Sequence, residues 1–474
     1  MKIGKIFGIL GNFLQIYSLL LIFPVVVGLM YGESIFNLSV FLFASVFSLI
    51  TGSLMSYLGD SGDPSVREAI VATVAGWVLA VLIGAIPILP HTSLVNAVFE
   101  AMAGLTTTGI SIFLEPSNLP NSVLFWRSFM QWIGGLGILT FFIAVIRESG
   151  GISQRLFSAE AHKTDAGSIR PSLMKSIVDL WRVYGFVTSL IFVTYVSLGM
   201  NLFNAVNHSF TVLSTGGFST TSQSLAAFNP AIQAATVLFM FTGGVNFVLL
   251  YMLLKADWRT VLKNTELKVY TGIFLVMTAL TTHQLLSKTG FTQALLDGSF
   301  QIAAIISSTG FSNMQITWFS VPLQLIFLVL MFVGGSLGST AGGLKVFRLV
   351  TMFKLLKTRL RAYSLPETAV NKVNVDGEIL GDDSVKTISV LMFAWVSTTF
   401  LSAIIIVAMD GVSFLGALSS TVSAVGNMGP LYLTGEKLVN LTVISKVTMM
   451  FGMLAGRLEM LPLLAIFNRK VIKH

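Results

Sequence analysis

The stretch Leu105–Ser111, which reads LTTTGIS, decides the fold because the chain returns to its pattern three more times. The returns are Leu213–Ser219 (LSTGGFS), Ser307–Ser312 (SSTGFS) and, more loosely, Val425–Pro430 (VGNMGP). Each copy is a short run that reaches a glycine, and a long apolar segment follows it. A glycine can turn its carbonyl group where a residue with a Cβ meets a steric cost. Four such turns around one axis would form a ring of oxygens that can replace the hydration shell of a monovalent cation.

The composition indicates a membrane protein. Hydrophobic residues make up 54% of the 474 residues, charged residues only 11%, and the mean hydropathy is +0.83. A soluble domain has roughly 25% charged residues. Cysteine is absent, which excludes disulfides, zinc ribbons and thiol catalysis. The five histidines have no metal-ligand spacing and no nucleophile–base cluster is present, so we expect neither an enzyme nor an organic cofactor.

The apolar pattern predicts about ten transmembrane helices of about 20 residues each. They cover residues 8–31, 36–58, 69–90, 121–146, 178–200, 230–254, 268–287, 319–350 (interrupted), 385–409 and 440–467. Shorter apolar stretches precede the glycine motifs, near residues 96–107, 204–215, 297–308 and 416–427. Because these stretches are too short to cross a bilayer, we interpret them as pore helices. The first span lacks a signal-peptide cleavage pattern, so we interpret it as a retained helix.

The basic residues predict the orientation. Most of the 29 Lys and Arg residues lie near the chain ends and near four loops, at 59–68, 147–177, 255–267 and 351–384. The positive-inside rule then places both termini and these loops in the cytoplasm. The net charge of +8 is therefore explained by topology, with anionic membrane lipids as a contact and without a nucleic-acid partner.

The order of these segments predicts an all-α polytopic membrane protein with an internal repeat. Residues 1–64 hold two spans and no glycine motif, so we interpret them as an accessory hairpin. From there the unit is span, pore helix, glycine motif and span, which gives pore repeats at 65–150, 151–264, 265–364 and 365–474 around a central ion pore.

Two sets of position-matched residues support the repeat. Thirteen residues before the motif glycines stand Asn96, Asn204, Asp297 and Gly416, which we expect to be helix N-caps. Nine residues before them stand polar residues in apolar surroundings, namely Glu100, His208, Gln301 and Ser420.

Three residues from each motif form the predicted ion site. Each pore helix directs the negative end of its dipole at its motif, which favours a cation just beyond. Non-helical backbone at membrane depth is tolerated where it lines a cavity or is buried in protein. One copy alone would be an ordinary Ser/Thr-Gly helix break, but four equivalent copies favour a pore. The predicted selectivity filter is Thr107, Thr108, Gly109, Thr215, Gly216, Gly217, Ser308, Thr309, Gly310, Asn427, Met428 and Gly429.

Residues 334–343 interrupt the eighth span. Five glycines within these ten residues cannot hold a stable helix, because each costs about 1 kcal/mol relative to alanine. They are Gly334, Gly335, Gly338, Gly342 and Gly343. We predict a flexible intramembrane loop below the filter, which is a candidate gate. The alternative is a close helix contact through small residues.

The last span contains Arg457, whose burial in an apolar helix costs at least about 2.5–3.5 kcal/mol unless it faces a cavity or a partner. Facing the pore, Arg457 would limit how long a cation dwells there. The alternative is a structural ion pair between repeats. Glu459 lies two positions away on another side of the helix, so it is not an automatic partner.

The chain resembles the Trk/Ktr/HKT superfamily of potassium transporters, most closely the bacterial and archaeal Trk-type membrane subunit. The motifs that carry the resemblance are Phe125–Ser128 (FWRS), Gln131–Gly137 (QWIGGLG), the glycine-rich run 334–343 and Gly456–Glu459 (GRLE). The resemblance implies a homodimer in the cytoplasmic membrane that binds a cytosolic nucleotide-sensing regulatory ring at its basic loops. It also implies a gating loop at 334–343 and a constriction at Arg457. The K⁺ ligands that it implies are Thr108, Gly109, Gly216, Gly217, Thr309, Gly310, Met428 and Gly429.

Two repeats depart from the pattern. Gly216 stands where two other repeats have Thr, which leaves the register between Gly216 and Gly217 open. The fourth repeat has Asn427 and Met428, so we expect it to contribute backbone oxygens only. Some eukaryotic relatives that favour Na⁺ have Ser in the first repeat, so Gly109 favours K⁺.

The predicted function is K⁺ uptake through a gated, K⁺-selective pore. The alternative is a proton- or sodium-coupled K⁺ symporter on the same scaffold. A symporter needs an intramembrane carboxylate relay, for which the sequence offers chiefly Glu100 and Glu459. A purely structural scaffold would not need the fourfold polar pattern.

Overall fold

The computed structural model describes residues 2–60, 62, 64–148, 169–364, 373–376, 378–429 and 432–466. Pro430 of the fourth motif, parts of the turn at 59–64, parts of the predicted basic loops 147–177 and 351–384 and the two chain ends lie outside the described residues. The predicted all-α membrane fold is confirmed. The described strands form one small antiparallel hairpin, β1 (Asn374–Val375) with β2 (Glu378–Ile379).

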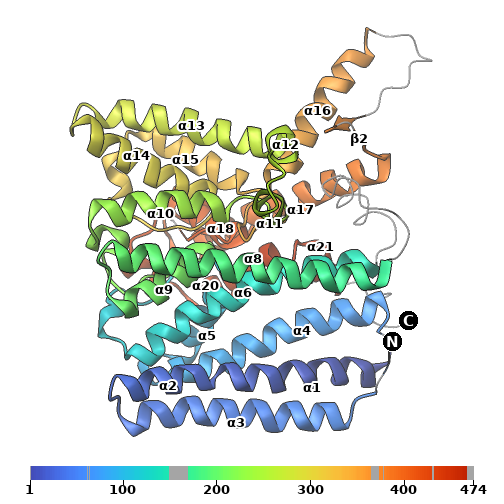
Figure 1. Cartoon of the computed structure of the whole chain (residues 1–474), viewed down its shortest axis with the longest axis vertical. Helices are drawn as coiled ribbons and strands as arrows, with labels where there is room; N and C mark the ends of the chain where they lie inside the picture. The colour runs from blue at the N-terminus through green and yellow to red at the C-terminus, as the bar shows by residue number, and fades with distance from the viewer. Residues whose placement is uncertain are drawn as a thin grey trace.

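The leading hairpin consists of α1 (Ile3–Leu20), α2 (Ile22–Met30) and α3 (Ile35–Tyr57), which form the lowest layer in Figure 1. Small residues allow α1 and α3 to pack closely. The hydroxyls of Ser45 and Ser48 donate across the contact to backbone carbonyls of α1, and each hydrogen bond is 2.8 Å long.

Each of the four following units has a helix, a short buried pore helix and a second helix. The first contains α4 (Val66–Ala85), η1 (Ile86–His91), α5 (Leu94–Leu105), η2 (Pro116–Asn118) and α6 (Asn121–Glu148). The second contains α8 (Ile169–Ser197), α9 (Leu202–Leu213), η3 (Ser224–Ala227), α10 (Pro230–Gly243), α11 (Phe247–Leu254) and α12 (Trp258–Lys263). The third contains α13 (Thr265–Leu285), α14 (Phe291–Ile306), η4 (Ile316–Trp318), α15 (Val321–Val333) and α16 (Val346–Ala362). The fourth contains α17 (Asp382–Asp410), α18 (Phe414–Gly426), α19 (Gly435–Val439), α20 (Val443–Arg457) and α21 (Leu461–Ile466).

The pore helices α5, α9, α14 and α18 begin earlier than predicted. Their N-cap residues are Ser93, Asn201, Gly290 and Ser413. The predicted caps Asn96, Asn204, Asp297 and Gly416 are therefore wrong, since all four lie inside the helices. In α9 and α18 the true cap accepts a hydrogen bond from the backbone amide of the residue predicted to be the cap, Asn204 or Gly416.

Two predicted continuous spans are broken. The span 230–254 bends by 107° between α10 and α11. The Gly244 carbonyl accepts a hydrogen bond from Ser336 N (2.8 Å), and Phe247 N donates to the Gly338 carbonyl (3.1 Å), so the break accommodates the loop 334–345. The span 440–467 breaks between α20 and α21, where Glu459 and Met460 have positive φ angles of 61° and 57°.

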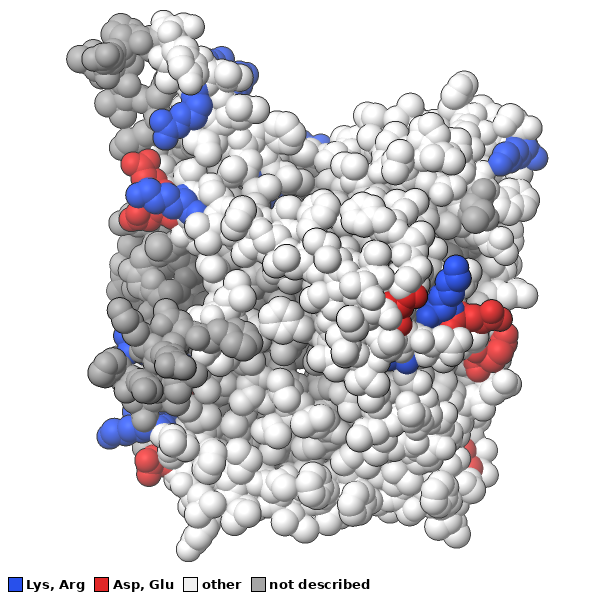
Figure 2. All heavy atoms as spheres, turned by 180° about the vertical axis from the view of Figure 1, so that it is seen from behind, with Lys and Arg blue, Asp and Glu red and all other residues white. Residues whose placement is uncertain are grey.

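The outer surface suits a lipid environment. Among the described residues, five helical segments are long and apolar enough to cross a bilayer, and a sixth if α10 and α11 count as one span. Figure 2 shows a broad uncharged surface, with charged side chains mainly toward the left and right margins of the view. The chain is therefore a multi-pass membrane protein.

Candidate ion site

The four glycine motifs have the same backbone conformation. The residue two positions before each final glycine is left-handed, with φ of 54° at Thr107, Thr215 and Ser308 and 50° at Asn427. The glycines themselves, Gly109, Gly217, Gly310 and Gly429, have φ of 75°, 76°, 77° and 86°. This pattern resolves the register that the sequence left open in the second repeat, because Gly217 takes the place of the final glycine. Gly216 is therefore equivalent to Thr108, Thr309 and Met428.

The motifs meet one another in cyclic order. A Cβ added to Gly109 would overlap the carbonyl oxygen of Gly216, and one added to Gly217 would overlap that of Thr309. A Cβ on Gly429 would lie 3.1 Å from the Thr108 oxygen and 3.4 Å from the Cα atom of Gly310. The four turns thus lie side by side around one axis, and their glycines allow this close approach.

Burial also follows the fourfold pattern. The two residues that precede each final glycine are buried, whereas all four final glycines are partly accessible. Backbone amides fold back onto the pore helices, as Thr108 N does to Ala103 O (2.9 Å) and Met428 N to Ser423 O (3.0 Å). Carbonyl oxygens of the motifs lie where neighbouring turns contact one another.

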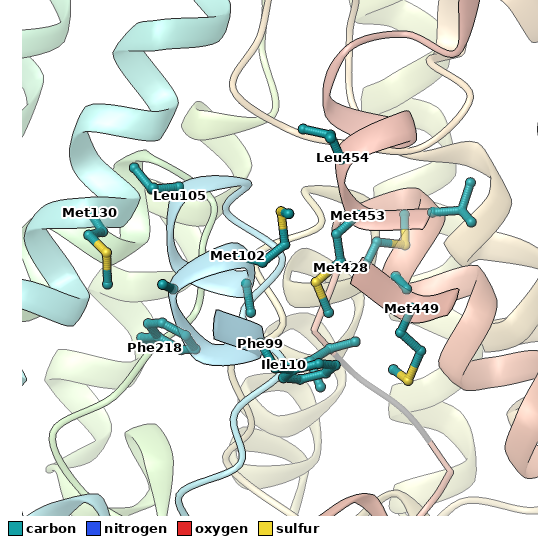
Figure 3. Packing of buried hydrophobic residues seen from close by; sticks show 14 of the residues in the cluster. Phe99, Met102, Leu105, Ile110, Met130, Phe218, Met428, Met449, Met453 and Leu454 are labelled. Carbon is teal, nitrogen blue, oxygen red and sulfur yellow. The ribbon is translucent and has the colours of Figure 1, made fainter. Parts of the chain in front are cut away.

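Hydroxyl groups brace two of the turns internally. Thr106 and Thr108 share a hydrogen bond of 2.7 Å in the first repeat, and Ser307 and Thr309 share one of 2.7 Å in the third. In the fourth repeat Asn427 Nδ2 donates to Thr108 Oγ1 and to the Met453 carbonyl, both over 2.9 Å. Figure 3 shows the apolar packing around the first and fourth turns, with Leu105, Met130, Met428 and Met453 in one buried cluster.

Two of the four polar residues nine positions before the final glycines brace the segments that follow their turns, whereas Ser420 donates to Gly416 O within its own helix (2.8 Å). Glu100 is fully buried and forms a 2.7 Å ion pair with Arg127, while its other oxygen accepts from Ile112 N (2.9 Å). Its counterpart His208 places Nε2 3.1 Å from the hydroxyl of Ser219. The sequence indicated these polar positions, but it did not identify Arg127 as the partner of Glu100.

The segment 334–345 is a loop between α15 and α16, so the alternative of a helical contact is wrong for it. The loop contacts the ends of three pore helices through one hydroxyl and two backbone amides. Thr340 Oγ1 donates to the Leu213 carbonyl (2.8 Å), Gly342 N to the Ser308 hydroxyl (2.5 Å) and Gly343 N to the Gly426 carbonyl (2.9 Å). The loop therefore lies directly against the turns.

Glu266 ties this loop to the start of α16, a contact that the sequence did not reveal. Its Oε1 atom accepts hydrogen bonds from Leu337 N (2.8 Å) and Phe347 N (2.9 Å). The side chain belongs to the first turn of α13 and is 4% exposed. One carboxylate oxygen thus joins the loop to α16.

Arg457 contacts backbone carbonyls instead of the ion-pair partner considered from the sequence. Its Nη1 donates to Thr340 O (3.1 Å) and its Nη2 to Gly134 O (2.7 Å). Glu459 pairs with Arg348 of α16. A cavity of about 20 Å³ between the loop, Arg457 and Glu459 has room for about one water molecule.

The chain matches known proteins over almost its whole length. The family model of TrkH, described as cation transport protein, matches residues 37–266 and 252–472. An uncharacterized cation transporter of Methanocaldococcus jannaschii is 30% identical, with 98% of this chain and 95% of that protein covered. The Trk system potassium uptake protein TrkH of Escherichia coli K12 is 28% identical, with 97% of each chain covered.

A solved structure has the same fold. The crystal structure of the potassium transporter TrkH from Vibrio parahaemolyticus is matched with a TM-score of 0.89 and 26% identity over 99% of this chain and 100% of that one. The four convergent turns are thus part of a fold shared with a solved transporter. The chain belongs to the TrkH family of cation transport proteins.

Proposed function

We propose that this chain is the K⁺-conducting subunit of a potassium uptake system and that the four turns form its selectivity filter. The observation that carries the proposal is the cyclic contact of the motifs through Gly109, Gly217 and Gly429. Carbonyl oxygens at such a contact suit a dehydrated monovalent cation. The names of the Escherichia coli and Vibrio relatives support K⁺ as the ion.

We further propose channel-like conduction. The two carboxylates that the sequence chiefly offers to a coupled symporter are both engaged, Glu100 with Arg127 and Glu459 with Arg348. A carboxylate that is tied into a close ion pair is not free to exchange partners along an ion path. The loop 334–345 and Arg457 close the path below the filter, which the small volume of the adjoining cavity supports.

The same proposal includes the assembly that the family resemblance implies. Two copies form a homodimer in the cytoplasmic membrane, with both termini in the cytoplasm and a nucleotide-binding regulatory ring bound there. The helix α16 projects from the body in Figure 1 and exposes Lys357, Arg359 and Arg361. These residues suit an anionic protein surface or anionic lipid headgroups.

Flux into proteoliposomes that contain only this protein tests the proposal. We expect saturable Rb⁺ and K⁺ uptake that follows the K⁺ gradient with or without a proton or Na⁺ gradient. Uptake that requires a second ion gradient would establish the symporter instead. No K⁺ or Rb⁺ flux under any gradient would refute the proposed function.

A further inference from the structure

The second repeat lacks the internal brace that its neighbours have. In the third repeat Ser307 pairs with the Thr309 hydroxyl, but in the second repeat Ser214 faces Gly216, which has no side chain. The Ser214 hydroxyl instead donates weakly to the Thr211 carbonyl over 3.4 Å. Another group must hold this turn.

Gln131 of α6 occupies the space that a side chain at position 216 would take. A Cβ added to Gly216 would overlap the Gln131 carboxamide. Gln131 Nε2 donates to the Gly216 carbonyl (2.7 Å), and Gln131 Oε1 accepts from Phe218 N (3.1 Å). The side chain is fully buried, so both ends of its amide are used away from water.

Two other helices that follow a pore helix, α10 and α20, have methionine at this place. Three glycines pack against equivalent carbonyls at the ends of pore helices. Gly134 of α6 packs against the Leu105 carbonyl, and Gly456 of α20 packs against the Val425 carbonyl. A Cβ added to Gly243 of α10 would lie 3.4 Å from the Leu213 carbonyl oxygen. Three residues before these glycines stand Gln131, Met240 and Met453. Gln131 of the first repeat contacts Gly216 of the second. By the same spacing, the position equivalent to Gly216 for Met240 of the second repeat is Thr309 of the third.

We infer that Gln131 is a positioning residue of the ion path, which clamps the second filter turn from the neighbouring repeat. The inference rests on the proposed function. A carbonyl oxygen has two lone pairs, so the Gly216 oxygen keeps one for an ion while Gln131 fixes its direction. The second turn thereby presents its oxygen without the hydroxyl brace used by the first and third turns.

A repeat swap tests the clamp. Gly216→Thr alone must overlap Gln131, so we expect loss of conduction and a lower melting temperature. Gln131→Met alone frees the Gly216 carbonyl and leaves Phe218 N without its partner. We expect its K⁺-over-Na⁺ permeability ratio to fall about two- to tenfold, the range set by one hydrogen bond. The double variant reproduces the Met240, Ser307 and Thr309 arrangement, so we expect conduction and selectivity to return toward wild type.

Gln233→Met is the matched control. Gln233 is also a buried glutamine with both amide ends bonded, to Phe228 O (2.9 Å) and Asn313 Nδ2 (3.2 Å), and none of these contacts involves a filter turn. We expect it to change the melting temperature without changing the permeability ratio.

Three outcomes would overturn the clamp: wild-type behaviour of Gly216→Thr, an unchanged ratio in Gln131→Met, or a double variant no better than Gly216→Thr alone. Each is judged in a preparation whose wild-type protein conducts K⁺. Absence of K⁺ flux through the wild-type protein would instead overturn the proposed function and, with it, any role of Gln131 in conduction.

Discussion

The guanidinium of Arg457 joins the loop to the protein core, because its Nη1 atom donates to the Thr340 carbonyl over 3.1 Å while Nη2 donates to Gly134 of α6 over 2.7 Å. Thr340 in turn donates its hydroxyl to the Leu213 carbonyl over 2.8 Å. One side chain of the fourth repeat therefore links the first repeat to a loop of the third. This arrangement fits a latch that keeps the path closed.

Arg457→Ala should raise K⁺ flux. Each hydrogen bond to a charged group contributes about 1.5–3 kcal/mol, so losing one shifts the loop equilibrium about tenfold or more toward the open form. Rb⁺ uptake into proteoliposomes measures the change. Arg457→Lys keeps the charge but loses the planar fork that reaches two carbonyls, so we expect an intermediate flux. Unaltered flux in both variants would remove Arg457 from the gate.

Glu266→Ala should destabilise the protein and loosen the loop. It leaves the buried amides of Leu337 and Phe347 without their acceptor, at a cost of about 1–3 kcal/mol for each unsatisfied group. We expect a lower melting temperature together with higher basal flux. Glu266→Gln is the matched control, since its Oε1 atom can still accept both hydrogen bonds. A control as damaging as the alanine variant would show that the negative charge, and not the acceptor, holds the loop.

The sequence alone predicted the parts of the fold that repeat. The motif glycines, the pore helices and the interruption at 334–343 all follow from local composition, because glycine content and apolar length act within a few residues. It failed where the deciding partner is distant in the chain. At the bend, the Gly244 carbonyl accepts a hydrogen bond from Ser336 N, and the Glu266 carboxylate accepts one from Leu337 N. Both donors lie more than 70 residues away in the chain. The helix caps were missed because spacing alone does not fix where a helix begins: Asn96, Asn204 and Gly416 stand at the third helical position and Asp297 at the seventh.

The same distinction applies within the candidate site. The αL turn at Thr107 and its counterparts could be anticipated from the glycine two residues later, which signals an irregular backbone. The ion pair between Glu100 and Arg127 could not, because the two residues lie on different helices and nothing in their spacing joins them. Likewise, the sequence shows that Gly216 departs from the Thr of two other repeats, but not why. The structure gives the reason, because the Gln131 side chain occupies the space that a side chain at position 216 would take.

Removing one partner of the pair Glu100–Arg127 should be strongly destabilising. Both side chains are at most 2% exposed, and breaking such a buried pair costs about 3–5 kcal/mol because it leaves an uncompensated charge. Thermal unfolding of Glu100→Gln in detergent measures the loss. The pair Asp179–Arg182, whose side chains are 17% and 73% exposed, is the control, where Asp179→Asn should cost at most about 1 kcal/mol. Equal shifts in the two variants would contradict the structural role of the buried pair.

Gly109→Ser should weaken the preference for K⁺ over Na⁺. The new Cβ would overlap the Gly216 carbonyl oxygen, and φ at this residue is 75°, so serine must displace the neighbouring turn or leave its conformation. A residue with a Cβ in this region costs about 1–2 kcal/mol. We expect the K⁺/Na⁺ permeability ratio to fall about fivefold, which corresponds to about 1 kcal/mol. Gly185→Ser of α8 is the matched control, because among the described residues no atom outside the adjoining stretch of α8 lies within 4 Å of the added Cβ. If both variants kept the wild-type ratio, the first turn would not belong to the filter, and the cyclic contact of the four motifs would have to serve packing alone.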